Sequence, residues 1–163
     1  MPILMMTPDD DMFQSGCEAL VNTVNCVGVD GKGVALECKK SFPENSSHYR
    51  QYCREFGMKP GDVVFTRRGQ LPMPHLRPHP EIVYILNVAT KDDWRRPSRL
   101  QWVGLGVSAL RVEIEQLGIK SVAVPALGCQ NGGLLWSEVL PYIERELNLP
   151  DVLVKVYPPH IRA

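Results

Sequence analysis

A lysine lies directly after an apolar run in the middle of the chain, at the position where a strand would end. The run spans residues 84–90, and Lys91 follows it. A lysine whose pKa falls below its reference value of roughly 10.4 can attack as an amine, whereas a protonated lysine can stabilise a leaving group. Most lysines are solvated surface charges. Position alone therefore makes Lys91 only a candidate catalytic residue.

Two glycine-rich loops each follow another apolar run. The first loop follows residues 19–24, and the second follows residues 121–125. Glycines let a backbone come close to a ligand, and a helix start directs free N–H groups toward an anion. Each loop alone is better explained by structural turn glycines, but the two together favour a ligand site. Asn22 and Asn25 add carboxamides that suit the hydroxyls of a sugar.

The pattern of apolar residues predicts alternating strands and helices. Strands are expected over residues 3–6, 19–24, 62–66, 82–88, 121–125 and 152–157. Apolar spacings of three and four predict a helix over 98–117, stopped by Gly118. Further helices are expected near Lys32, after Pro43 and from an N-cap at Ser137. The helix after Pro43 would carry an apolar stripe of Tyr49, Tyr52, Cys53 and Phe56.

This order predicts an α/β fold, a three-layer α/β/α sandwich with a mixed, largely parallel sheet. Ligands in such folds bind at the carboxyl ends of the strands, where both glycine loops would lie. The length of 163 residues suits one domain over residues 1–163.

Composition narrows the class of protein. Lysine plus arginine and aspartate plus glutamate both number 18, so contact with nucleic acid requires a local basic patch. Five cysteines with no C-x-x-C spacing argue for a reduced, cytoplasmic protein. No apolar run is long enough to span a bilayer. We expect a monomer that uses no cofactor or metal. The pair His75 and His79 lies among prolines that forbid a helix, which predicts an exposed extended loop.

The loops and their strands resemble those of macrodomains, which bind ADP-ribose. The similarity is carried by residues 19–25 with the first loop, and by residues 124–129, which lead into the second loop. The stretches 21–35, 87–99 and 125–139 are most similar to the DNA ADP-ribosyl glycohydrolases of the DarG type, which remove ADP-ribose from thymidine. A more distant similarity is to the animal terminal ADP-ribose protein glycohydrolase, which acts on glutamate esters.

The resemblance implies a role for each matching residue. Asp11, beside Met12, would take the adenine amino group, although Asp10 stands where the family usually has glycine. Asn22 and Asn25 would bind or orient the distal ribose, and Lys91 would be catalytic. The diphosphate and ribose would be held by Gly31, Lys32, Gly33, Val34, Gly128, Cys129, Gln130, Asn131, Gly132 and Gly133. The second loop lacks the aspartate that relatives often use as an acid/base partner.

A tryptophan and three arginines follow Lys91 at Trp94, Arg95, Arg96 and Arg99. They suit the phosphates and an unstacked base of single-stranded DNA. The alternative is a solvated helix start with Trp94 packed on the core. Three functions follow: removal of ADP-ribose from DNA, removal from protein glutamate, or ADP-ribose binding without catalysis. Lys91 argues against the third, and the arginines favour the first.

Overall fold

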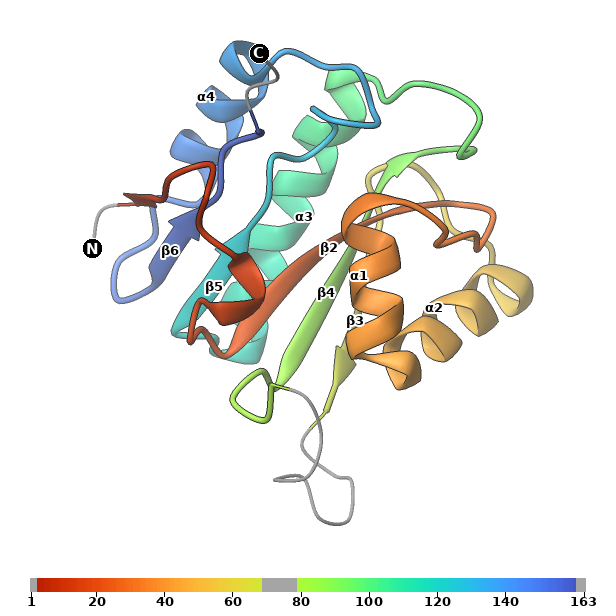
Figure 1. The fold of residues 1–163 in the computed structure, drawn as a ribbon, viewed down its shortest axis with the longest axis horizontal. Helices are drawn as coiled ribbons and strands as arrows, with labels where there is room; N and C mark the ends of the chain where they lie inside the picture. The colour runs from red at the N-terminus through yellow and green to blue at the C-terminus, as the bar shows by residue number, and fades with distance from the viewer. Residues whose placement is uncertain (1–2, 69–78, 161–163) are drawn as a thin grey trace.

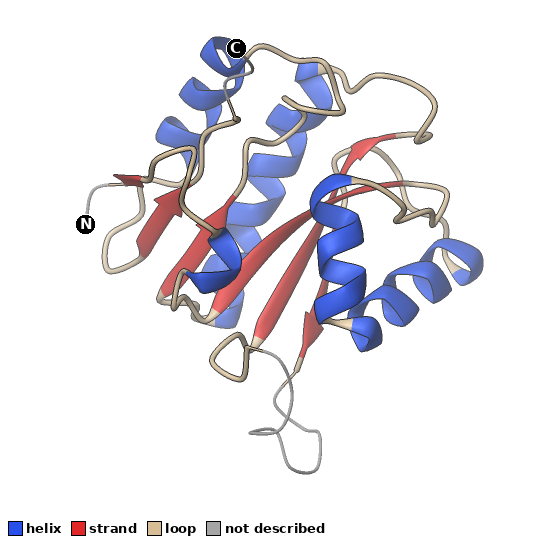
Figure 2. Cartoon of the chain, in the orientation of Figure 1, coloured by secondary structure: helices blue, strands red, loops and turns tan. Residues whose placement is uncertain are grey.

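A mixed sheet forms the middle layer of the computed structural model, which describes residues 3–68 and 79–160 (Figures 1 and 2). In the described residues its six strands lie in the order β1-β6-β5-β2-β4-β3. Only the β3–β4 pair is antiparallel. The strands are β1 Leu4–Met5, β2 Ala19–Asn25, β3 Val63–Arg67, β4 Tyr84–Lys91, β5 Ser121–Val124 and β6 Leu153–Val156.

Helices cover both faces of this sheet. Figure 1 shows α1 and α2 on one face and α3 and α4 on the other, which confirms the predicted three-layer sandwich. A short 3-10 helix, Met12–Gln14, precedes β2. The α-helices are α1 Gly33–Ser41, α2 Pro43–Glu55, α3 Leu100–Leu117 and α4 Trp136–Glu146.

Strand β2 shows why the central strands are continuously apolar. Ala19 and Val21 are buried in the core under α3 and α4, while Leu20 packs in the core on the α1 side. Val24 lies in a third cluster with Tyr49 of α2. Because successive side chains point to opposite faces, a strand covered on both sides needs apolar residues at odd and even positions alike.

Helix α2 departs from its predicted apolar stripe. Tyr49 is buried as predicted, but Phe56 is 72% exposed, so the stripe prediction was wrong at Phe56. Phe56 is the C-cap, beyond the last helical residue Glu55. The helix also buries Asn45, which exchanges hydrogen bonds with Asn87 of β4 at 3.0 and 2.8 Å.

Several element boundaries also differ from their predictions. Strand β4 ends at Lys91, whereas the predicted strand ended at residue 88, so Lys91 is the last residue of the strand and does not follow it. Helix α4 begins at Trp136 with Leu135 as its N-cap, so Ser137 lies inside the first turn and is not the cap. Gly118 does end α3, with a φ of 64°. His75 and most of its predicted loop lie outside the described residues. His79 is half-buried, and its ring lies 6.0 Å from that of Phe13 and 5.8 Å from that of Phe42, so the predicted exposure was wrong at this histidine.

None of the helices in the described chain combines the length and apolar character that crossing a bilayer requires.

Candidate active site

A cleft of about 910 Å³ opens at the carboxyl ends of β2, β4 and β5. Its walls come from the ends of these strands, the start of α1, the segment before β2 and the segment after β6. The volume is typical of a pocket that encloses a ligand the size of a nucleotide. Both predicted loops contribute to the lining, since Gly31, Lys32, Gly33 and Val34 lie on one side and Gly128, Cys129, Gln130, Asn131 and Gly132 on the other.

The first loop ends at the start of α1. Gly33 opens this helix with a φ of 57°, and Lys32 is an extended N-cap whose side chain caps no backbone N–H. The N-cap side chain therefore leaves the N–H groups of the first turn uncapped, and these groups can donate hydrogen bonds to an anion in the cleft.

The second loop is held tightly from behind. The N–H of Ser98 donates to the Gly132 carbonyl at 3.0 Å, and Gly128 has a φ of 73°. A side chain at Gly132 would collide with the Gly128 carbonyl and the Ser98 hydroxyl. Gly133 is the one predicted member of this loop that does not line the cleft.

Asn131 connects the two loops and the lysine. Its backbone carbonyl accepts a hydrogen bond of 2.8 Å from Lys91 Nζ. Its side-chain Nδ2 lies 2.7 Å from the point where a Cβ on Gly33 would stand. The start of α1, the second loop and the end of β4 therefore meet at this residue.

Lys91 is half-buried at the end of β4 and faces the cleft. Burial, together with repulsion from Lys32, lowers the pKa of the Lys91 amine below its ordinary value. No carboxylate forms an ion pair with Lys91 in the part of the chain that the structure describes. The nearest acids in sequence, Asp92 and Asp93, pair with Arg96 and Arg95 at 3.4 and 3.3 Å.

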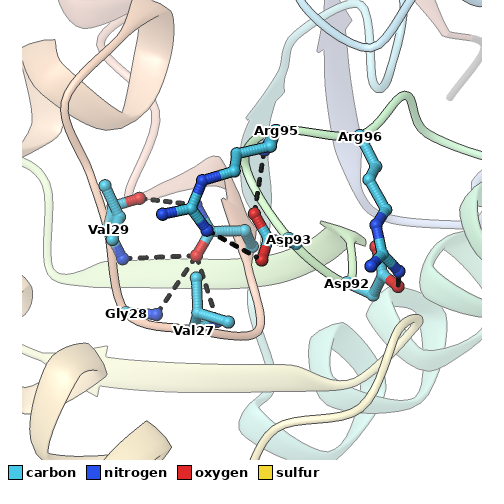
Figure 3. A network of polar contacts seen from close by, with 8 residues as sticks. Val27, Gly28, Val29, Asp92, Asp93, Arg95 and Arg96 are labelled. Carbon is cyan, nitrogen blue, oxygen red and sulfur yellow. Dashed lines mark hydrogen bonds and ion pairs between the residues drawn. The ribbon is translucent and has the colours of Figure 1, made fainter.

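Asn25 lines the cleft, but most of its carboxamide is used inside the first loop. Its Oδ1 accepts hydrogen bonds from the N–H groups of residues 27, 28 and 29 at 3.1, 3.1 and 3.2 Å (Figure 3). Its Nδ2 donates to the Val29 carbonyl at 2.6 Å, and the buried Tyr49 hydroxyl donates to the Asn25 carbonyl at 2.6 Å. One N–H of the amide remains for a ligand.

Asn22 does not reach the cleft. It is 2% exposed, and its Nδ2 donates to Asn87 Oδ1 at 2.9 Å beneath α2. Asn87 in turn donates to the Val64 carbonyl, which links β2, β4 and β3. Direct binding of the distal ribose by Asn22 is corrected by this position, because its side chain points into the α2 layer three residues before the strand ends. An orienting role of Asn22 stays a prediction.

The segment before β2 brings Asp11 and Met12 to the cleft wall. Asp11 is exposed, and its Oδ1 accepts from the Phe13 N–H at 2.9 Å. Asp10 is not among the residues with positive φ, so the aspartate in place of the family's usual glycine requires no strained backbone. The adenine-binding role of Asp11 stays a prediction.

The segment after Lys91 forms one lip of the cleft. Trp94 lines the cleft and is 42% exposed, so it is not packed on the core. The Arg95 guanidinium lies 4.6 Å from the centre of its ring. Arg99 is the N-cap of α3, and its guanidinium lies 5.0 Å from the centre of the Trp102 ring. Arg95, Arg96 and Arg99 are exposed but do not line the cleft.

Cys129 is not placed to act as a nucleophile. Burial raises the pKa of its thiol to about 11, and its Sγ lies 3.5 Å from the Leu127 carbonyl oxygen. The thiol is therefore protonated at neutral pH. All five cysteines are free, and no cluster of possible metal ligands occurs in residues 3–68 and 79–160.

Sequence reasoning missed the residues that support the site from behind. Tyr49 and Asn45 on α2, Asn87 within β4 and Ser98 before α3 each fix a loop or strand through long-range contacts. Asn87 gave one usable signal, because a polar residue inside a continuously apolar strand needs a buried partner.

A largely parallel sheet with a cleft at its carboxyl edge, lined by two glycine loops, is the arrangement with which α/β folds bind phosphate-containing ligands. The Macro domain family profile matches residues 21–143, and the chain belongs to this family.

The most informative relatives are bacterial. The chain is 42% identical over 150 residues to the DNA ADP-ribosyl glycohydrolase of Thermus aquaticus and 41% identical to that of Mycobacterium tuberculosis. These matches cover 91% of this chain but only 39% and 40% of the curated relatives.

Solved structures agree with the sequence comparison. The macrodomain of Thermus aquaticus DarG matches with a TM-score of 0.83 and 39% identity, over 96% of this chain and 99% of that one. Thermosipho africanus DarTG in complex with ADP-ribose matches with a TM-score of 0.85 and 31% identity, over 98% and 43%.

Proposed function

We propose that this protein is an ADP-ribosyl hydrolase that removes ADP-ribose from thymidine in single-stranded DNA, with Lys91 as its catalytic residue. The relatives named DNA ADP-ribosyl glycohydrolase support the substrate, and the ADP-ribose complex of a structural neighbour supports the ligand. The observation that carries the proposal is the position of Lys91 Nζ, which lies in the cleft between the two loops and is held by Asn131.

The cleft suggests how ADP-ribose would lie. Asp11 lines the cleft from the segment before β2 and would take the adenine. The N-terminus of α1 lies beside Asn131 of the second loop, and the diphosphate would lie between them. The distal ribose would then reach the remaining N–H of the Asn25 amide and Lys91. Because Asn25 and Lys91 are register partners on β2 and β4, both lie at the reacting end.

Two roles for Lys91 are consistent with this position. As a free amine it would attack the anomeric carbon of the distal ribose and form a C–N bond, while the bond from this carbon to the thymine base breaks. The base stays in the DNA strand and takes up a proton. Water would then cleave the bond to Lys91 and release ADP-ribose. The lowered pKa of Lys91 supports this role. As an ammonium ion it would stabilise the departing thymine while water attacks. The monomeric state expected from the sequence is part of this proposal.

The test is to incubate the protein with two labelled substrates in parallel, ADP-ribosylated single-stranded DNA and a glutamate-modified protein. We expect label to leave the DNA and to remain on the protein. Release only from the protein would replace this function by glutamate ester hydrolysis, and release from neither would leave a binding module.

Substitution of the lysine tests its role. Lys91→Ala should abolish removal of ADP-ribose from DNA, while calorimetry should still detect ADP-ribose binding. The binding measurement is the control for folding, since most of the expected ligand contacts come from the two loops and Asn25. Wild-type rates in Lys91→Ala would remove Lys91 from the mechanism.

A further inference from the structure

Two exposed apolar side chains, Val29 and Trp94, line the cleft at the end where Lys91 lies. Val29 is 43% exposed and Trp94 is 42% exposed, and Val27 beside them is 49% exposed. The Cys26 N–H lies within hydrogen-bond distance of the carbonyls of Lys91 and Asp92, at 3.1 and 3.3 Å, so the segments that carry these side chains are joined at their bases. Large apolar groups exposed at the mouth of a cleft indicate a binding surface.

The surface is rigid on both sides. The turn over residues 27–29 is fixed by the Asn25 carboxamide (Figure 3). A Cβ at Gly28 would lie 3.6 Å from Cys53 Cβ and 3.7 Å from Arg50 Cγ, so this turn lies against α2. On the other side the Arg95 N–H donates to Asp93 Oδ1 at 2.9 Å and closes the turn that carries Trp94. Neither segment has to become ordered when a ligand binds, which favours affinity.

We propose that Val29 and Trp94 form the subsite for the nucleobase that carries the ADP-ribose. This inference rests on the proposed function and deepens it. The group attached to the anomeric carbon must leave the cleft at the Lys91 end, where it meets this surface. The Arg95 guanidinium lies 4.6 Å from the centre of the Trp94 ring. Trp94 lines the cleft and is 42% exposed, so part of this side chain is accessible for stacking.

The chemistry of the surface favours a base over a glutamate side chain. A planar base gains from stacking on an aromatic ring, whereas a flexible carboxylate ester has no ring to stack. Arg95 and Arg96 flank the surface with exposed cationic groups, as required for the phosphates on either side of an extruded base. The subsite thus separates DNA from protein substrates.

The test compares Trp94→Ala and Val29→Ser with the wild type on ADP-ribosylated single-stranded DNA. Trp94→Ala should lower kcat/KM on the order of 10-fold through lost stacking. Val29→Ser, which keeps the backbone contacts to Asn25, should lower it roughly 3-fold through lost apolar contact. Trp94→Phe should keep most of the rate, and affinity for free ADP-ribose should stay unchanged in all three variants.

Phe56→Ala is the matched control, because it removes an aromatic ring that is 72% exposed but lies outside the cleft. A substrate reduced to one ADP-ribosylated thymidine nucleotide should show the same loss in Trp94→Ala, since the subsite takes the modified base itself. If the loss appears only with longer DNA, or if ADP-ribose affinity falls equally, the assignment is overturned.

Failure of the proposed function and failure of the subsite would give different results. A wild-type protein that leaves ADP-ribosylated DNA intact would overturn the proposed function and this inference with it. A wild-type protein that is active on DNA, together with wild-type rates in Trp94→Ala and Val29→Ser, would overturn the subsite alone.

Discussion

Two lysines, Lys32 and Lys91, line the cleft, and no arginine of the described chain does so. They lie at the start of α1 and at the end of β4, and Asn131 contacts both regions. A bound diphosphate would lie close to both amines. Burial lowers the pKa of Lys91, and the positive charge of Lys32 lowers it further.

Lys32→Met should raise the pKa of Lys91. The substitution removes a positive neighbour that disfavours the protonated amine, so the pKa moves toward its ordinary value, while burial still holds it below. If the free amine is the reactive form, the pH at which the rate rises should move upward as well. Titration of lysine side chains by NMR measures the pKa. Lys40→Met, at an exposed site on α1 outside the cleft, is the control, and an unchanged pKa in Lys32→Met would contradict the link.

Arg95 and Arg96 are exposed at the lip and paired with acidic residues of the same turn. Surface pairs of this kind contribute little to stability, so a phosphate can displace the carboxylates. The double substitution Arg95→Ala with Arg96→Ala should weaken activity on DNA and reduce the salt slope of binding by up to about 2. Arg145→Ala on α4 is the control. An unchanged salt slope would exclude a DNA contact at these residues.

At the scale of elements, the second loop is preformed by its contact with the segment before α3. Ser98 holds the Gly132 carbonyl, and Gly132 has no space for a side chain. The loop that would hold the diphosphate and the lip that carries Trp94 are thus attached to each other at Ser98 as well as through Lys91 and Asn131.

Gly132→Ala should weaken ADP-ribose binding by about 10-fold or more, because the added methyl group forces the loop away from Ser98. Isothermal titration calorimetry measures the affinity, and a thermal melt shows whether the fold persists. Ser137→Ala should change neither quantity, since Ser137 lies exposed inside the first turn of α4 and does not cap it. Unchanged affinity in Gly132→Ala would mean that the loop tolerates displacement.

The first loop depends on helix α2 in a comparable way. Tyr49 reaches from the helix to the Asn25 carbonyl, and Asn45 pairs with Asn87 on the neighbouring strand. These buried polar contacts specify how the helix sits on the sheet, because each leaves an unpaired group if the helix slides.

Across the whole molecule, α3 packs unusually close to the central strand β4. A Cβ at Gly106 would lie 2.6 Å from Val88 Cγ1. Gly106→Ala should therefore lower the free energy of unfolding by about 1–3 kcal/mol, as overpacking does. Urea denaturation measures the change, and Ser108→Ala at an exposed site on the same helix is the control. Equal stability of the two variants would show that the helix can move away freely.

Much of this fold was predictable from local pattern. The two-sided apolar runs of β2, β4 and β5, the stripe of α3 and its stop at Gly118 were all predicted from residue order. Phe56 and Ser137 were assigned wrongly because each prediction used only the helix itself. Whether a helical residue is buried depends on the surface that the helix meets, and for α2 this surface carries Asn22 and Asn87.

The sequence by itself predicted the family and the two loops that line the cleft, because each depends on residues close together along the chain. It also singled out Lys91, whose catalytic role stays a prediction. The tertiary structure decided which carboxamide faces the cleft, with Asn25 at the strand end and Asn22 buried against Asn87, 65 residues away. It also decided that Lys91 is held by Asn131, 40 residues further on. Such contacts depend on the order of strands in the sheet, and local periodicity contains no record of that order.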